Sequence, residues 1–263
     1  MDEIQERILM EVADLHGVPE GAYNIRANGK LASRSTTANI DITTKEDVSG
    51  IDIRIKPGTK HESVHIPVVV SESGLKDMVY NDFYIGEDCD VVIVAGCGIH
   101  NCGDQDAEHD GIPRFYVGKN AKVKYVEKHY GEGDGRGKRI LNPLTEVHME
   151  ENSYVEMEMV QIKGVDSTDR VTNAELAAGA KLIVRERLLT HGTQSAVSTY
   201  VVDLNGDDAS TDLVSRSVAK DQSIQTFNSK INGNAKCSGH SECDAIIMDD
   251  AKIIAVPGLT ANN

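Results

Sequence analysis

A short pattern that recurs along most of the chain constrains the fold more than any other feature. Each copy is a polar or glycine-containing turn, a small residue, and a strand in which apolar and polar side chains alternate. The small residues are Thr59, Cys89, Ala121, Ser153, Ala180, Ala209, Ala235 and Ala251. The first six steps between them are 26 to 32 residues long, and the last is 16. A nearly constant step predicts a solenoid, in which each coil stacks on the one before it.

The segments between the repeated strands distinguish an all-β solenoid from a fold in which a helix follows each strand. Strands at this spacing also occur in folds where a helix follows each strand. Segments such as residues 195–202 are instead rich in β-branched residues, which favour strands. We therefore predict an all-β fold, a parallel β-helix over residues 20–263. The short last step is either a half-coil or a sign that each coil carries two strands.

Before the repeats begin, apolar residues recur at the spacing of a helix. Ile4, Ile8, Leu9, Val12 and Leu15 would share one helical face, which predicts a helix within residues 1–19. The end of a solenoid exposes unpaired backbone and core side chains. We therefore expect this short N-terminal helix to cover one end of the stack.

Composition and charge exclude several function classes. The 263 residues carry a formal charge of −15, which argues against binding to a nucleic-acid backbone. No apolar run approaches the ~20 residues that span a bilayer, so we expect no membrane segment. The five cysteines are an odd number, which a disulfide framework does not predict. We expect free thiols in a reducing, cytoplasmic compartment.

A first group of candidate ligands follows an apolar strand at residues 91–95. The strand leads into a glycine-rich stretch that holds Cys97, His100 and Cys102, and we expect the glycines to form a loop that exposes the thiols. The spacing is not a standard zinc pattern. Ordinary loop cysteines and a sulfur or metal-ligand site both remain open. His109 joins the group only if the fold brings it back over Cys97.

A second group lies near the end of the sequence. This group resembles a metal clip with two cysteines and one histidine, namely Cys237, His240 and Cys243. Cys243 also enters an apolar strand at residues 243–247, where a cysteine is equally well explained as a small buried residue. Residues alone leave the metal site and the core position both open.

Three motifs resemble one family. Residues 92–97, Val-Ile-Val-Ala-Gly-Cys, resemble the SufB strand that runs into a Gly-Cys-Thr-Ala-Pro loop, and residues 121–125 resemble the strand that follows it. Residues 241–247, Ser-Glu-Cys-Asp-Ala-Ile-Ile, resemble the SufB motif Gln-Cys-Asp-Ser-Leu/Met-Leu-Ile. From about Ile40 onward, the chain resembles the SufB/SufD family of scaffolds for iron–sulfur cluster assembly in the SUF system. The resemblance implies a right-handed parallel β-helix flanked by helical parts.

The resemblance also implies roles for individual residues. Cys97 stands where the family has its sulfur-accepting cysteine, and Cys243 where it has the cysteine of the nascent cluster, which makes Cys243 the expected metal ligand. The additional candidates for sulfur or cluster binding are Cys102, His109, Cys237 and His240. The implied cargo is a transient iron–sulfur cluster, and the implied role is that of a scaffold and not of an enzyme. The implied partners are a cysteine desulfurase as sulfur donor, a SufC-type ATPase, and a SufB/SufD-type sister subunit or a second copy.

The sequence departs from the SufB pattern in two places. The first cysteine motif reads Gly-Cys-Gly-Ile-His-Asn-Cys and not Gly-Cys-Thr-Ala-Pro. The sequence stops at Asn263, before the expected His-Glu segment and the helices that hold SufC. We therefore expect the C-terminal SufC-binding part to be absent and further ligands of Cys243 to lie beyond Asn263. The alternative function is a non-catalytic, SufD-like subunit for dimerisation, for which no cysteine substitution matters.

Overall fold

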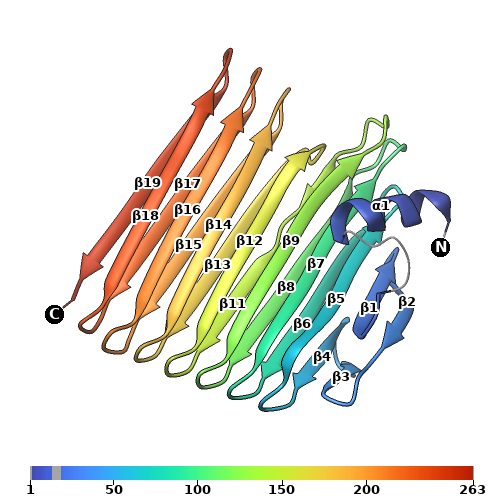
Figure 1. Ribbon diagram of the computed structural model, residues 1–263. Helices are drawn as coiled ribbons and strands as arrows, with labels where there is room; N and C mark the ends of the chain where they lie inside the picture. The colour runs from blue at the N-terminus through green and yellow to red at the C-terminus, as the bar shows by residue number, and fades with distance from the viewer. Residues whose placement is uncertain (1, 14–18, 263) are drawn as a thin grey trace.

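The computed structural model describes residues 2–13 and 19–262, and within them it is a solenoid of two parallel sheets (Figure 1). The elements are α1 (Glu3–Ala13), β1 (Ala22–Ala27), β2 (Lys30–Ser35), β3 (Ile40–Thr44), β4 (Gly50–Ile55), β5 (Lys60–Val70), β6 (Lys76–Ile85), β7 (Asp90–His100), β8 (Ala107–Val117), β9 (Lys122–Glu132), β10 (Arg139–Leu141), β11 (Leu144–Met149), β12 (Tyr154–Lys163), β13 (Ser167–Leu176), β14 (Lys181–Thr190), β15 (Ser195–Leu204), β16 (Ser210–Ala219), β17 (Ile224–Gly233), β18 (Ser238–Ile247) and β19 (Lys252–Ala261). The prediction of an all-β parallel solenoid with a short N-terminal helix is confirmed.

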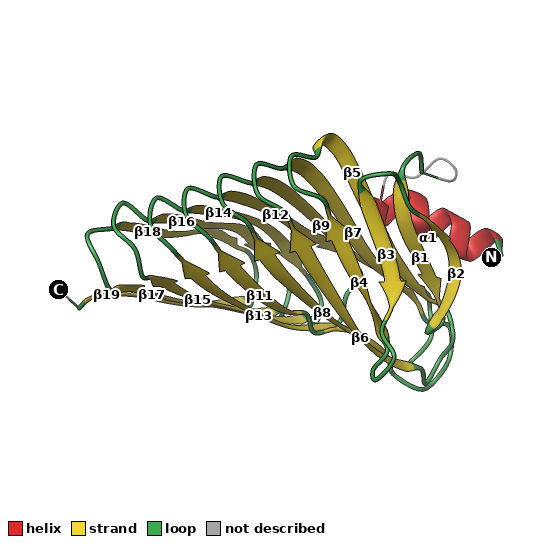
Figure 2. Cartoon of the chain, turned by 90° about the horizontal axis from the view of Figure 1, so that it is seen from below, coloured by secondary structure: helices red, strands yellow, loops and turns green. Residues whose placement is uncertain are grey.

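Each coil contributes one strand to each sheet. The described strands form a first sheet in the order β18-β16-β14-β12-β9-β7-β5-β1-β2 and a second in the order β19-β17-β15-β13-β10-β8-β6-β4-β3, with β11 paired to β8 and β13. Figure 2 shows the two sheets facing each other along the length of the stack. Along the strands of the middle coils, such as β9 and β12 to β15, buried side chains alternate with more exposed ones, so the core lies between the sheets. Each coil therefore carries two strands, which settles the meaning of the short last step.

The tight turns explain the repeated pattern. At the turns that enter the first sheet, one residue adopts a positive φ, which suits glycine, asparagine and aspartate. Asp88 has φ 57°, Asn120 has φ 56° and Gly179 has φ 67°. The residue after each of them is small and fully buried, as Cys89 and Ala121 are.

Two of the predicted repeat positions need correction. Ser210 pairs with Ser238, so the residue in line with Ala209 is Cys237 and not Ala235. Ala251 precedes β19 of the second sheet, so it belongs to the opposite row of turns. The sequence misled because Asn234-Ala235 has the same turn chemistry as the true turn positions.

The helix does not cover the end of the stack as expected. That end holds β2 and β3, which pair antiparallel with β1 and β4. Helix α1 lies instead on the outer face of the first sheet, where Ile8, Leu9 and Val12 pack against Val69 and its neighbours (Figure 1). Leu15 of the predicted helix lies outside the described residues.

The contact with α1 also corrects the expected glycine-rich loop. Gly96 and Gly98 lie inside strand β7, so Cys97 is a strand residue and faces the opposite way. A Cβ at Gly96 would collide with the backbone of Val12, and one at Gly98 with the side chain of Ile8. The two glycines therefore allow α1 to lie flat on the strand that carries Cys97.

At the far end of the stack, β18 and β19 expose apolar side chains. Ile246 is 61% exposed and Leu259 is 60% exposed. The other large exposed apolar residues of this end are Ile247, Met248, Ile254 and Val256. The apolar run after Cys243 is thus not the buried strand that the sequence suggested. No other coil of the described chain packs against this end.

Candidate functional site

Polar residues occupy inward positions of the first sheet, between Cys97 and Cys243. Strand register aligns Cys97 with His129 and Gln161 on neighbouring coils. The adjacent inward row contains Ala95, Glu127, Met159, Glu186, Ser215 and Cys243. Cys243 therefore lies five strands along the stack from the coil of Cys97, a separation of about 24 Å at about 4.8 Å per strand.

The environment of Cys97 is built by two histidines from different strands. His109 of β8 and His129 of β9 both hydrogen-bond to its thiol. Nδ1 of His109 lies 3.1 Å from Oδ2 of Asp77, which is buried beside it on β6. The fold thus brings His109 back over Cys97, which was the condition set by the sequence.

The histidines change the acidity of this thiol. Burial raises the pKa of Cys97, but the charges and hydrogen bonds of His109 and His129 outweigh it and lower the pKa to about 7. Burial lowers the pKa of His109, whereas Cys97 and Asp77 raise it to about 10. The pKa of His129 is about 9 for similar reasons, with Glu127 as the main anion. At neutral pH, the half-buried Cys97 is therefore partly a thiolate, and the imidazoles of His109 and His129 beside it are protonated.

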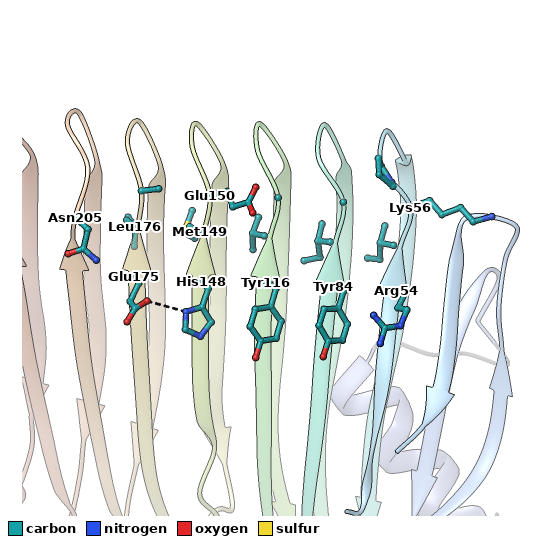
Figure 3. Close-up of a pocket in the computed structure, with 17 residues that line it drawn as sticks. Arg54, Lys56, Tyr84, Tyr116, His148, Met149, Glu150, Glu175, Leu176 and Asn205 are labelled. Carbon is teal, nitrogen blue, oxygen red and sulfur yellow. Dashed lines mark hydrogen bonds and ion pairs between the residues drawn. The ribbon is translucent and has the colours of Figure 1, made fainter. Parts of the chain in front are cut away.

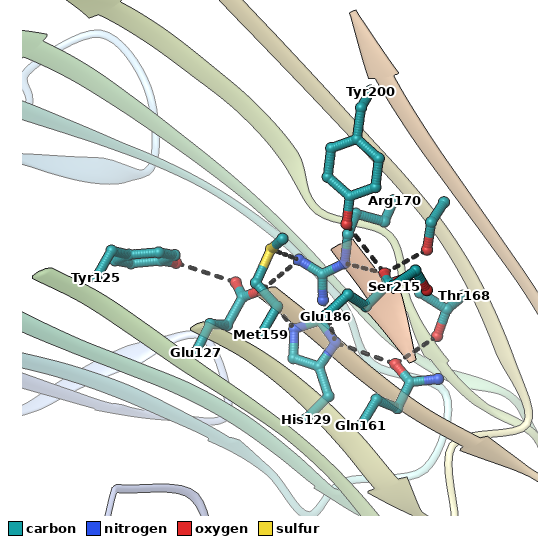
Figure 4. A network of polar contacts seen from close by, with 11 residues as sticks. Tyr125, Glu127, His129, Met159, Gln161, Thr168, Arg170, Glu186, Tyr200 and Ser215 are labelled. Carbon is teal, nitrogen blue, oxygen red and sulfur yellow. Dashed lines mark hydrogen bonds and ion pairs between the residues drawn. The ribbon is translucent and has the colours of Figure 1, made fainter. Parts of the chain in front are cut away.

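A buried arginine continues the polar row toward the other end (Figure 4). Arg170 of β13 is paired with Glu127, and its Nε lies 3.9 Å from Oε1 of Glu186. Its Nη2 also lies 3.3 Å from Nδ1 of His129. Although burial raises the pKa of Glu127, Arg170 outweighs that effect and holds the pKa well below its usual range. The buried carboxylate of Glu127 therefore stays ionised inside the solenoid because the guanidinium of Arg170 lies beside it.

Hydroxyl groups complete the row. Glu186 accepts hydrogen bonds from Ser198 at 2.5 Å, Tyr200 at 3.0 Å and Ser215 at 2.6 Å. Ser215 is the strand neighbour of Cys243. A cavity of about 10 Å³ lies beside Arg170 and Glu186, which is about the room that one water molecule needs. Most strands between the two cysteines therefore contribute a hydrogen-bonding group to the interior.

Cys243 has the opposite electrostatics from Cys97. It is half-buried on β18, and burial followed by the negative charges of Glu186 and Asp244 raises the pKa of its thiol. His240 lies on the outer face of the same strand, with Nε2 3.4 Å from Oε2 of Glu242. Cys237 precedes the strand and packs against the core, as its repeat position requires. The structure thus separates His240 from Cys243.

Cys102 lies apart from the interior row. It follows β7, it is exposed, and its Sγ is 3.1 Å from Nε2 of His100. Among the described residues, no three His, Cys, Asp or Glu side chains are grouped so as to hold a metal ion.

An outer groove of about 680 Å³ lies over the second sheet, away from the cysteines (Figure 3). Arg54, Tyr84, Tyr116, His148 and Glu175 form a row along it, and the rings of Tyr84 and Tyr116 stack at 5.1 Å. Its lining residues include none of the five cysteines. The groove is therefore separate from the candidate sulfur site.

Sequence reasoning missed the interior charges. Glu127, His129 and Glu186 occupy inward positions of β9 and β14, where their strand neighbours are apolar. A charged residue in the apolar phase of an alternating strand was the available signal. Asp77 carries the same signal on β6, where the next inward residue is Val79. The inward neighbours of Arg170 on β13 are Thr168 and Thr172, which give no such signal.

No helix in the described part of the chain is long and apolar enough to span a membrane. Residues 83–263 match the family model described as "SUF system FeS cluster assembly, SufBD core domain". An iron–sulfur cluster assembly SufBD family protein of Methanocaldococcus jannaschii is 27% identical over 209 residues, covering 78% of this chain and 65% of that protein. A SufBD family protein of Archaeoglobus fulgidus is 26% identical over 220 residues, covering 82% of this chain and 57% of that one.

A further relative is the SufBD family protein of Methanothermobacter thermautotrophicus, which is 23% identical over 217 residues, with 81% of this chain and 52% of that protein covered. The chain thus spans between about half and two thirds of the length of these curated relatives. The family model covers well over half of the chain, from the end of β6 through the last strand, β19. This chain therefore belongs to the SufBD core family of the SUF system.

Proposed function

We propose that this chain is an assembly scaffold that accepts sulfur as a persulfide at Cys97 and passes it along the solenoid interior to Cys243. There the sulfur meets iron and electrons supplied by other components, and the Cys243 thiolate helps to hold the nascent cluster. The observation that carries the proposal is the polar row from Cys97 through Arg170 to Cys243, which crosses an otherwise apolar core.

The acidity of Cys97 supports its role as acceptor. A thiolate attacks the outer sulfur of a donor persulfide, the S–S bond of the donor breaks, and the donor leaves as a thiol. With a pKa of about 7, Cys97 supplies that thiolate at neutral pH. His109 and His129 can hold the charge of the resulting persulfide anion because both stay protonated in this environment.

Anaerobic cluster reconstitution tests the proposal. The chain is incubated with ferrous iron, L-cysteine and a cysteine desulfurase, and the visible absorbance of the cluster is followed. Cys97→Ser and Cys243→Ser should both abolish the signal. Cys89→Ala is the matched control, because Cys89 is a fully buried repeat residue whose equivalent on the next coil is Ala121.

A second sulfur source separates the two roles. When inorganic sulfide replaces the desulfurase, Cys97→Ser should form clusters again, because sulfur uptake is bypassed. Cys243→Ser should remain inactive. Normal cluster formation by Cys243→Ser with either source would overturn the proposal and favour the SufD-like alternative, in which no cysteine substitution matters.

The partners form a second part of the proposal. The exposed apolar end made by β18 and β19 fits pairing with a SufB/SufD-type subunit or a second copy, because unpaired strand edges invite further strands. A cysteine desulfurase as donor and a SufC-type ATPase complete the set. Analytical ultracentrifugation of the chain and of Ile254→Lys tests pairing, and a monomer in both cases argues against a dimer of this chain.

A further inference from the structure

Three side chains outside the interior row form a line on the surface beside α1. Sγ of Cys102 lies 3.1 Å from Nε2 of His100, and Nδ1 of His100 lies 2.9 Å from Oε1 of Glu132. The thiol is exposed, whereas the side chains of His100 and Glu132 are only 16% and 17% exposed. A nucleophile, a base within hydrogen-bond reach and a third group that orients the base are the arrangement of an activated thiol.

Other residues hold Glu132 in place. Arg7 of α1 forms an ion pair with it, and the hydroxyl of Tyr130 donates a hydrogen bond to its Oε2 at 2.9 Å. Burial raises the pKa of Glu132, but the hydrogen bonds from Arg7, His100 and Tyr130 outweigh that effect. The pKa of Glu132 therefore lies below its ordinary value. The carboxylate therefore stays charged and fixes the ring of His100.

The loop that carries Cys102 is also fixed. The side-chain amide of Asn101 donates hydrogen bonds to the carbonyl oxygens of Gln105 at 2.8 Å and Lys138 at 3.2 Å. The loop of the next coil stacks on it, since the backbone N–H of Gly135 donates to the carbonyl of Asn101 at 3.1 Å. A Cβ at Gly135 would collide with the Cys102 loop. The thiol thus has a preorganised position, which favours a chemical role.

The geometry distinguishes a relay from a chelate. The imidazole stands between the thiol and the carboxylate and uses both of its nitrogens for them. The described residues place no third ligand around this thiol for a metal ion. Cys102 also contributes nothing to the core, because it is exposed.

We propose that Cys102 is a surface nucleophile that accepts sulfur from a persulfide donor, with His100 as its general base. His100 takes the proton of the thiol at Nε2, and the Cys102 thiolate attacks the outer sulfur of the donor, R–S–S–H. The S–S bond of the donor breaks, and R–S⁻ leaves and recovers the proton from His100. The products are the Cys102 persulfide and R–SH, and no net oxidation occurs.

This inference deepens the proposed function, because it assigns sulfur uptake to an exposed thiol that precedes the half-buried Cys97. Its chemistry is nonetheless tested separately from cluster formation, since persulfide on Cys102 can be measured without iron. Failure of the cluster experiment would leave the Cys102 result standing, and the reverse also holds.

The experiment loads the chain with glutathione persulfide, or with a persulfide-charged cysteine desulfurase, at pH 7. Persulfides are trapped by alkylation and assigned to Cys89, Cys97 or Cys102 by peptide fragmentation and mass spectrometry. Cys102 should be loaded before Cys97, and buried Cys89 should stay unloaded. The donor that reacts faster identifies the source as a small molecule or a protein, and loading of Cys102 by neither overturns the proposal.

The variants test the base. His100→Ala should slow loading of Cys102 about 10- to 100-fold, and added imidazole should restore part of the rate. Glu132→Gln should give a smaller loss. His148→Ala is the matched control, because His148 also pairs with a glutamate, Glu175 at 3.3 Å, on the outer surface. Circular dichroism confirms that each variant is folded.

Two results would overturn the proposal. The first is loading of Cys102 in His100→Ala at the wild-type rate. The second is loading of Cys97 in Cys102→Ser at the wild-type rate with the donor that loads wild type, since Cys97 would then need no surface thiol. In Cys97→Ser, loading of Cys102 should be unchanged.

Discussion

The two ends of the interior row hold cysteines with opposite environments. Cys97 lies under α1 among protonated histidines, and its pKa falls to about 7. Cys243 lies at the exposed end of the stack near Glu186 and Asp244, which together with burial raise its pKa. Both thiols are half-buried. The difference in acidity therefore comes from neighbouring charges and not from access to solvent.

The comparison teaches how one scaffold can give two thiols different tasks. A thiolate at neutral pH is an acceptor that attacks a persulfide, whereas a protonated thiol reacts when a metal ion displaces its proton. Because the two cysteines share one inner face of the first sheet, the contrast depends on which charged residues lie beside each of them. His109 and His129 lie beside Cys97, whereas Glu186 and Asp244 lie near Cys243.

The largest effect is expected at the residue between the two ends. Arg170→Ala should lower the free energy of unfolding by about 3–5 kcal/mol, because Glu127 and Glu186 would remain buried without their cation. Urea denaturation followed by circular dichroism measures it. Arg185→Ala is the control, as the Arg185–Asp212 pair lies on the surface with both side chains about a third exposed or more. Equal costs for both variants would contradict a charged interior.

The contrast in acidity should appear directly as thiol reactivity. At pH 7, about half of Cys97 is thiolate, whereas burial and the charges of Glu186 and Asp244 raise the pKa of Cys243 and keep its thiol protonated. Iodoacetamide should therefore label Cys97 faster than Cys243 by about tenfold or more, as followed for each residue by mass spectrometry. The rate at Cys97 should rise with pH through about 7, and the rate at Cys243 should rise only at higher pH. Parallel pH profiles would remove the distinction between the two ends.

Removing one histidine should make the two ends more alike. His109→Ala takes away the main cation beside Cys97, so the pKa of Cys97 should rise and its labelling at pH 7 should slow about tenfold. His191→Ala, at an exposed turn, serves as control. A midpoint that stays near pH 7 in His109→Ala would assign the low pKa to His129 alone.

The smallest effect concerns α1, which packs on the outer face of the first sheet over the strand of Cys97. Gly98→Ala should lower the free energy of unfolding by about 1–3 kcal/mol, because the added methyl group would force Ile8 and α1 away from β7. Thermal unfolding measures it. In Gly111→Ala the new Cβ would have its nearest contact at an ordinary 3.5 Å, so this control should change little. A neutral Gly98→Ala would show that α1 adapts to a larger residue.

Local signals predicted the architecture because each turn into the first sheet has a recognisable sequence pattern. A residue suited to positive φ, then a small residue, then an alternating strand marks the start of each first-sheet strand, as at Asp88-Cys89 and Asn120-Ala121. The same signals failed at Ala235, because Asn234 and Ala235 satisfy them equally well. Only backbone pairing of Ser210 with Ser238 places Cys237 in line.

The candidate site was predicted only in part. The resemblance pointed to Cys97 and Cys243, but not to what surrounds them. Glu127 at an inward position is favourable only when Arg170 lies opposite, and these residues are 43 positions apart in sequence. Likewise, the alternating pattern of β7 does not reveal that His100 and Cys102 meet Glu132 of the next coil, 32 residues after His100.

The sequence by itself determined a stack of parallel coils, since the period, the turn residues and the strand alternation are all local properties. Through its resemblance to SufB, it also singled out Cys97 and Cys243 as candidate site residues. The tertiary structure alone decided which charges lie beside each thiol, where α1 packs, and that Cys102 joins a histidine and a glutamate. Stacking brings residues about 30 positions apart to within about 4.8 Å, and electrostatic energies depend on that distance in space and not on distance along the chain.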